Sequence, residues 1–120
     1  MISGVFREDH PRITLPLPGI RGEVRVEFIV GTGFAGDLTL PGNLAAQLDG
    51  EFAGLGERRL ANGQRFQCRT YEIVLDWVAE SRPVEVLVLE GDPLVGTVLL
   101  REHHLHVEMT DGGEALIEPL

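Results

Sequence analysis

Two short stretches of the sequence contain residue types that could do chemistry. The first is Gly31-Thr32-Gly33, which directly follows the apolar run Phe28-Ile29-Val30. A Gly-x-Gly turn after a strand lets the backbone approach a ligand closely, as in dinucleotide-binding folds. Such a site needs a helix to begin at the glycines, whereas Leu38-Thr39-Leu40-Pro41 follows here and has the character of a strand. We therefore expect no nucleotide at this turn.

The second stretch is Glu102-His103-His104-Leu105-His106-Val107-Glu108. On a strand, His104 and His106 share one face with both glutamates, because successive side chains point to opposite faces. Histidines at i and i+2 can bind Zn²⁺, but a structural zinc site normally has four ligands. No second group of ligands stands out elsewhere in the sequence, so we expect a solvated polar face, no metal ion and no cofactor.

Asp37 is the first acidic residue after the glycine turn, six positions beyond Gly31. In an extended chain, at about 3.3 Å per residue, it would lie some 20 Å from Gly31. We therefore expect Asp37 to be a solvated loop acid and not a displaced catalytic group.

Hydrophobic patterns predict the strands that must position these residues. Alternation of period two runs through residues 23–28 and 71–77, and buried or short strands are expected at 38–40, 84–89, 105–109 and 115–117. One helix is expected from Asn43 to Leu48, with Gly50 just past its end. Turn pairs such as Asn62-Gly63 lie between the strands. Short strands at this spacing favour an all-β barrel or sandwich formed by residues 1–120 as a single domain.

Composition restricts the function further. The 120 residues include 19 acidic side chains and 10 basic ones, all arginine, for a formal charge of −9. An acidic surface repels phosphate backbones, so we expect no nucleic-acid partner. No apolar run is long enough for a membrane span, no signal segment is seen, and Cys68 has no partner for an internal disulfide. We expect a cytoplasmic protein, with a mature secreted form left as an alternative.

The run from Phe28 to Pro41 resembles the active-site segment of retropepsin-like (clan AA) aspartic proteases. In that family an apolar strand leads into Asp-Thr-Gly, then a loop of small residues and a second apolar strand. This sequence has Gly31 where the catalytic aspartate would be. The family uses two carboxylates that share a proton and hold a water between them. Glycine can do neither.

Two further segments extend the resemblance over most of the chain. Leu94-Val95-Gly96 is similar to the hydrophobic-hydrophobic-Gly segment that lies beneath the catalytic loop and packs against it. Residues 60–64 stand where the family has its flap, the hairpin that closes over substrate. The two ends of the chain, 2–17 and 115–120, are similar to those of the compact bacterial and cyanobacterial members.

The resemblance implies an acid-protease barrel with one short helix, and a homodimer, because so short a chain supplies only half of such a site. It implies that Thr32 braces the two loops across the dimer axis and that Gly33 lets the backbone approach substrate. Phe34 and Ala35 would line the cleft. Ala61, Asn62 and Gly63 would cover it as the flap tip.

We therefore expect a retropepsin-like homologue whose catalytic centre is disabled at Gly31 and whose cleft, at a homodimer interface, binds extended peptides. In a symmetric dimer the one change removes both carboxylates. An alternative is an active aspartic endopeptidase whose native form has aspartate at position 31, or which pairs with a homologue that keeps it. A second alternative is a non-catalytic structural or regulatory β-domain.

Overall fold

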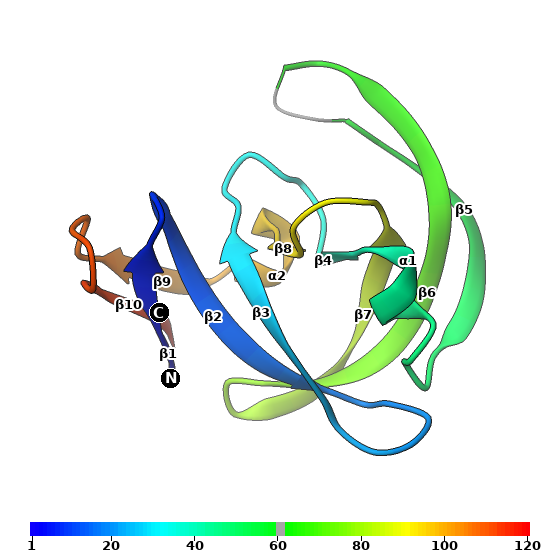
Figure 1. Ribbon diagram of the computed structural model, residues 1–120, viewed down its shortest axis with the longest axis horizontal. Coiled ribbons are helices and arrows are strands. Elements are labelled where there is room, and N and C mark those ends of the chain that lie inside the picture. The colour runs from blue at the N-terminus through cyan, green and yellow to red at the C-terminus, as the bar shows by residue number, and fades with distance from the viewer. Residues whose placement is uncertain (60–61) are drawn as a thin grey trace.

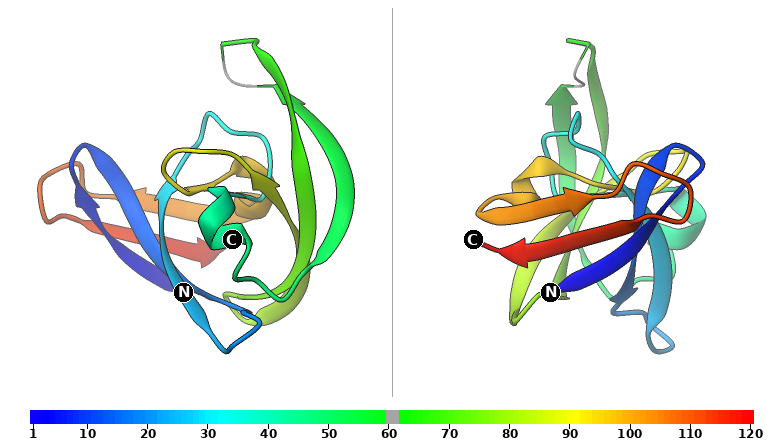
Figure 2. Two further views of the ribbon diagram at one scale, coloured as in Figure 1. Left: turned by 45° about the vertical axis from the view of Figure 1, so that its right-hand side comes forward. Right: turned by 90° about the vertical axis from the view of Figure 1, so that its left-hand side faces the viewer.

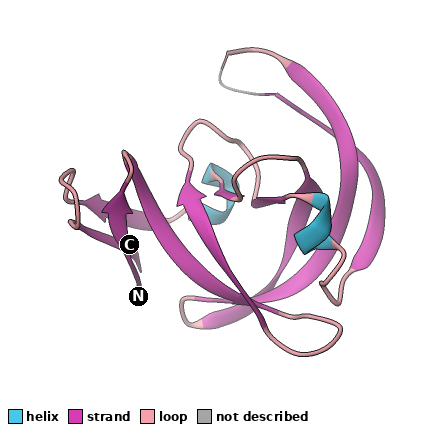
Figure 3. Ribbon diagram, in the orientation of Figure 1, coloured by secondary structure: helices cyan, strands magenta, loops and turns pink. Residues whose placement is uncertain are grey.

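The computed structural model describes residues 1–59 and 62–120 and is built almost entirely of β-strands (Figure 3). The strands and helices, in chain order, are β1 (Ile2–Arg7), β2 (His10–Leu17), β3 (Val24–Val30), β4 (Leu38–Leu40), α1 (Gly42–Ala45), β5 (Glu51–Arg59), β6 (Arg65–Trp77), β7 (Glu80–Val88), β8 (Leu94–Val95), α2 (Thr97–Leu100), β9 (His103–Val107) and β10 (Glu114–Pro119).

All the strands belong to one mixed sheet, in the order β5-β6-β7-β4-β8-β3-β2-β1-β10-β9. Hairpins give the antiparallel pairs β1·β2, β2·β3, β5·β6, β6·β7 and β9·β10. Two pairs are parallel, β3·β8 and β4·β7, and each joins segments far apart in the sequence. The parallel pair β3·β8 and the antiparallel pair β4·β8 bring the Gly31 and Gly96 segments together at the middle of the sheet.

The sheet curls around one main hydrophobic core. Alternate residues of β2, β3 and β6 point into it, including Phe28, Leu75 and Trp77, which are at most 1% exposed. This confirms the period-two patterns. A smaller cluster on the other side of the sheet contains Phe34, Cys68 and Leu87. The sheet is therefore covered on both faces where β4, β6 and β7 lie next to one another.

The strands do not pair into the barrel that the sequence led us to expect. The sheet is open among the described residues, with β5 and β9 as its two edges. Figures 1 and 2 show the reason, because the β5–β6 hairpin extends away from the body while β9 lies on the opposite side of the molecule. The edge strands are therefore too far apart to exchange hydrogen bonds.

The expectation of a single helix was also wrong. The predicted helix at 43–48 is present as α1, although its regular part is Gly42–Ala45. A second helix, α2, covers Thr97–Leu100. One turn of helix is too short to show a period of 3.6 residues, so nothing in the sequence distinguished α2 from a strand. Neither helix is long and apolar enough to span a membrane, and the described residues contain no other.

Candidate functional site

Gly31 lies at the end of β3, where it meets β8. The register pairs Ile29 with Leu94 and Val30 with Val95. The N–H of Gly31 donates to the carbonyl of Val95 at 2.8 Å, and the N–H of Ile29 donates to that of Pro93 at 2.9 Å. The apolar strand before the glycine turn is buried on both sides at this point, which explains its unbroken run of apolar residues.

The loop after Gly31 is fixed to the segment after Val95 by further main-chain hydrogen bonds. The N–H groups of Gly96, Thr97 and Val98 donate to the carbonyls of Asp37, Phe34 and Gly36 at 2.9, 2.8 and 3.1 Å. We call residues 31–39 together with 94–98 the glycine junction. The predicted packing of Leu94-Val95-Gly96 against the glycine loop is confirmed.

The two glycines that define the junction differ in the space around them. A Cβ placed on Gly96 would come within 2.3 Å of the Gly36 carbonyl oxygen and 2.5 Å of the Phe34 ring, so only glycine fits. A Cβ on Gly31 would meet nothing closer than 3.6 Å, the distance to Leu94, and its backbone conformation is open to L-residues. No steric contact therefore requires glycine at position 31.

The residues around Gly31 divide into exposed and buried ones. Thr32, Gly33 and Ala35 are exposed. Phe34, expected to line a cleft, is only 3% exposed and packs with Cys68 and Leu87 under the β5–β6 hairpin. In this structure the Phe34 side chain supports the loop from below, and the surface that the loop presents is made of small and polar groups.

Asp37 is not the solvated loop acid that the sequence suggested. Its Oδ2 accepts from the N–H of Glu85 at 2.9 Å. Its Oδ1 is buried and has no hydrogen-bond partner among the described residues. The reason is topological, because the parallel pair β4·β7 begins at Leu38 and Val86, and Asp37 caps the start of this pair. The acid is thus built into the junction and is held away from the exposed turn.

Thr39 and Thr97 are junction residues that sequence reasoning missed. Thr39 is 2% exposed, and its Oγ1 accepts from the N–H of Leu94 at 3.0 Å. The hydroxyl of Thr97 donates to the Phe34 carbonyl at 3.2 Å. A threonine inside a short apolar strand, like Thr39, or directly after a glycine, like Thr97, is a weak signal in sequence, because threonine is common in all strands. Only the crossing of the two segments gives these hydroxyls their partners.

The β5–β6 hairpin lies at the same end of the molecule as the 31–37 loop (Figures 1 and 2). Ala61, proposed for the flap tip, lies outside the described residues, as does Leu60. Asn62 and Gly63 are exposed, Gly63 has φ of +87°, and Asn62 Oδ1 accepts from the N–H of Gln64 at 2.9 Å. β6 begins at Arg65, shortly after this Asn-Gly pair. The asparagine closes a local turn at this point.

One ion pair joins the hairpin to the body of the molecule. Arg58 on β5 pairs with the carboxylate of Glu85 on β7, the residue whose N–H is bonded to Asp37. Burial raises the pKa of the neighbouring Cys68 thiol, and the charge of Arg58 opposes that rise only in part. The thiol therefore stays protonated and behaves as a core residue.

The histidine stretch forms β9, and its outer face is solvated as expected. His104 and His106 are exposed, and His104 lies 3.7 Å from Glu118. The described residues contain no group of three or more potential metal ligands. His103 points the other way: its Nε2 accepts from the Trp77 indole at 3.2 Å, and its Nδ1 lies 2.6 Å from the Arg101 carbonyl. Both ring nitrogens are therefore occupied.

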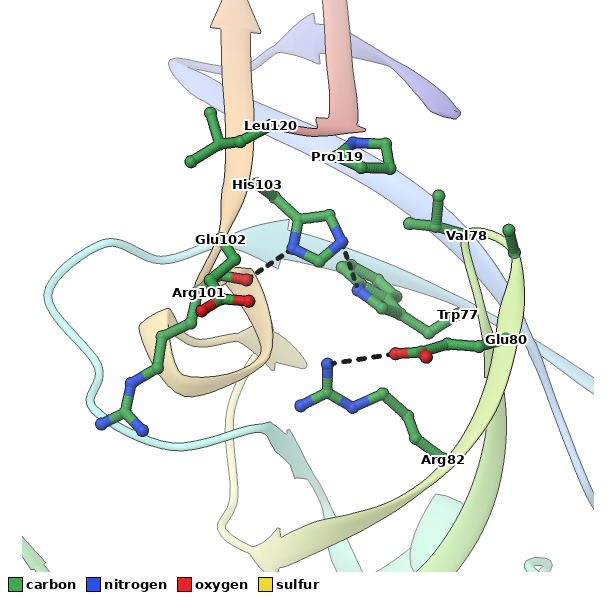
Figure 4. Close-up of a pocket in the computed structure, with 10 residues that line it drawn as sticks. Trp77, Val78, Glu80, Arg82, Arg101, Glu102, His103, Pro119 and Leu120 are labelled. Carbon is green, nitrogen blue, oxygen red and sulfur yellow. Dashed lines mark hydrogen bonds and ion pairs between the residues drawn. The ribbon is translucent and has the colours of Figure 1, made fainter.

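A surface hollow of about 600 Å³ opens beside this pair (Figure 4). Arg82 and Arg101 line it together with Glu80 and Glu102. Equal numbers of positive and negative groups give the hollow no preference for the charge of a ligand, and it is separate from the glycine junction.

The junction has a definite chemical character. Its single acid, Asp37, is anchored, and its exposed turn offers a threonine hydroxyl and backbone groups but no general acid or base. Such a surface can bind a polypeptide through its main chain but cannot by itself activate water. Comparison of the chain with protein-family models, with curated protein sequences and with solved structures gave no match.

Proposed function

We propose that this chain is a retropepsin-like aspartic protease homologue whose hydrolytic centre is disabled at Gly31. In this proposal two copies form a homodimer, and the cleft between them binds extended peptides. The observation that carries the proposal is the glycine junction itself. The glycine loop crosses a hydrophobic-hydrophobic-Gly segment and is bonded to it through the main chain of both.

The free space at Gly31 supports the same proposal. A residue that is glycine for steric reasons cannot be replaced, whereas position 31 has room for a side chain in ordinary van der Waals contact with Leu94. The residues around position 31 leave room for a carboxylate, and in this proposal the carboxylate is the only part of the catalytic centre that is missing. This also favours the second candidate, an active peptidase with aspartate at position 31 in its native form or in a paired homologue.

The test is to restore the acid and to control for its size. The unmodified chain is compared with Gly31→Asp and Gly31→Asn. Cleavage of a quenched fluorescent peptide library is measured between about pH 4 and 7, where a carboxylate pair that shares a proton works. We expect cleavage by Gly31→Asp alone, because asparagine has the same shape without the acid. Each general acid or base role is worth about 10²–10⁴ in rate, so the difference is readily measured.

Two results would contradict the proposal. Hydrolysis by the unmodified chain that a statine-type inhibitor blocks would show that the centre is not disabled. A folded Gly31→Asp protein that sedimentation shows to be a monomer, or that is dimeric and inactive, would favour the structural or regulatory β-domain instead.

A further inference from the structure

One face of the β5–β6 hairpin combines exposed apolar and basic side chains. Cross-strand pairing places Phe52 opposite Tyr71, Leu55 opposite Arg69 and Arg59 opposite Arg65. Cross-strand partners share a face, and so do alternate residues of one strand, so these side chains all lie on the same side. Phe52 and Leu55 are 60% and 72% exposed, and the three arginines are exposed as well. We call this set the hairpin face.

The hairpin face is a local reversal of the charge of the chain. Residues 57–69 contain four of the ten arginines and one of the nineteen acids, for a charge of +3. Arg58 lies on the opposite face, so Arg59, Arg65, Arg69 and Glu57 give the hairpin face itself a charge of +2. The rest of the chain, with six arginines and eighteen acids, has a charge of −12. The net negative charge of the whole chain gives no sign of a basic patch, but the hairpin forms one.

Two of these arginines lack a partner within the described chain. Arg65 is 3.5 Å from Glu57, and Arg58 is paired with Glu85 on the opposite face. Arg59 and Arg69 form no ion pair with any residue of the ranges 1–59 and 62–120. Arg59 lies directly opposite Arg65, and like charges in that position destabilise a strand pair. A carboxylate from a ligand would relieve this repulsion.

β5 is also an edge of the sheet. It is nine residues long and, in the described part of the structure, pairs only with β6. Alternate N–H and C=O groups along its outer side are therefore open to a further strand. Figure 1 shows β5 on the outside of the molecule, with no element covering its free edge.

We propose that β5 and the hairpin face bind an extended acidic polypeptide segment by strand addition. The segment pairs with the free edge of β5, places apolar side chains against Phe52 and Leu55, and places carboxylates near Arg59 and Arg69. Main-chain pairing supplies affinity, and the order of apolar and acidic positions supplies specificity. The proposal does not depend on the junction being a disabled peptidase, because it uses none of the junction residues.

The observations favour a polypeptide over a nucleic acid or a second copy of the chain. A nucleic acid would not use the strand edge or the apolar end of the face, and the −12 charge of the remaining surface would repel it. A second copy offers its own β5 edge, but that hairpin carries the same arginines and would repel this face. The other edge, β9, is only five residues long and presents histidines.

The test uses a fluorescein-labelled peptide of about ten residues, in which valine alternates with threonine in one half and with glutamate in the other. Binding is followed by fluorescence anisotropy at low and high salt. We expect Arg59→Glu combined with Arg69→Glu to weaken binding about tenfold, which is ~1.4 kcal/mol, because the positive charges that face the peptide are replaced by negative ones. A peptide with lysine in place of glutamate, and one N-methylated at alternate positions, should both fail to bind.

The variants separate loss of contact from loss of fold. Glutamate at position 59 faces Arg65 and forms a favourable cross-strand pair, so Arg59→Glu should unfold at the same temperature as the unmodified chain or higher. Arg21→Glu, on an exposed loop far from the hairpin in sequence, changes the net charge as much as Arg59→Glu alone does, and is therefore the charge control for that single variant; it should leave binding unchanged.

The proposal would be overturned if the lysine and glutamate peptides bound equally well or if neither bound. It would also be overturned if Arg21→Glu lost as much affinity for the acidic peptide as Arg59→Glu, or if a single-stranded oligonucleotide bound more tightly than that peptide. Self-association that Arg59→Glu abolishes, seen by sedimentation, would assign the face to a second copy instead. Since Gly31→Asp and Gly31→Asn leave the hairpin face intact, both should bind the acidic peptide whatever their peptidase activity.

Discussion

The glycine junction and the β5–β6 hairpin lie at the same end of the molecule but are held in different ways. At the junction two segments cross, and backbone N–H and C=O groups of residues 31–39 and 94–98 satisfy one another, with the hydroxyls of Thr39 and Thr97 completing the set. The hairpin beyond the small Phe34 cluster is held mainly by its own strand pairing and by the Arg58–Glu85 ion pair.

This difference determines which positions tolerate change. Loss of the hydrogen-bond partner of a buried main-chain group lowers the stability of the fold more than loss of an exposed ion pair, because water cannot replace the lost hydrogen bond. The junction should therefore be rigid and intolerant except at Gly31, whereas the hairpin should accept substitutions and move.

The largest expected effect is at Gly96, and Gly31 is its matched control. Gly96→Ala puts a methyl group 2.3 Å from a carbonyl oxygen and should destabilise the protein by about 3 kcal/mol or more. Gly31→Ala should be neutral or stabilise by up to about 1 kcal/mol, because the position has room and alanine restricts the unfolded chain. Urea unfolding followed by circular dichroism measures both, and equal losses would show that the junction does not distinguish its two glycines.

Removing one junction hydroxyl should have the next largest effect. Thr39→Val preserves the side-chain shape but leaves the N–H of Leu94 without its acceptor in a buried position, at a cost of about 1–3 kcal/mol. Thr39→Ser keeps the acceptor and should recover most of that loss. Hydrogen exchange of the Leu94 amide reports on the same bond, and unchanged protection in Thr39→Val would remove the threonine from the account of the junction.

The hairpin ion pair should contribute less. A double-mutant cycle with Arg58→Gln and Glu85→Gln should give a coupling free energy of at most about 1 kcal/mol, since both side chains are about one-third exposed. The coupling should fall in high salt, and exchange of the hairpin amides should quicken without change at the junction. Loss of protection at Gly31 and Gly96 in these variants would mean that hairpin and junction form one unit.

The ion pair between Arg7 on β1 and Glu27 on β3 provides the exposed reference and the smallest effect. The hydrogen bond from Arg7, together with its charge, lowers the pKa of Glu27 from its ordinary value of 4.5. A lowered pKa in the folded state means that the stabilisation is present above the unfolded pKa and is lost as the pH falls through the folded one. Stability should therefore decline slightly as the pH drops below about 4.5, and Arg7→Gln should flatten this part of the curve.

The period-two patterns were enough to locate the strands with buried faces. Val26 and Phe28 are separated by the charged Glu27, and Leu75 and Trp77 by Asp76, and burying one face of a strand favours that alternation. The segments at 31–33 and 94–96 were identified by their resemblance to a known family and not by these patterns, since a glycine next to an apolar run is a weak signal alone. Sequence reasoning failed for Asp37, because an acid in a turn has the same sequence signal whether its oxygens are solvated or buried.

The sequence by itself determined which residues could face a core, the excess of negative charge and the absence of an acid at position 31, because these follow from side-chain type and local spacing. Tertiary structure alone decided that Gly96 is sterically obligatory and Gly31 is not, and that Asp37 caps a parallel strand pair. The physical reason is that each of these facts depends on atoms brought together from distant parts of the chain. Long-range strand pairing, which local pattern does not specify, puts them in contact.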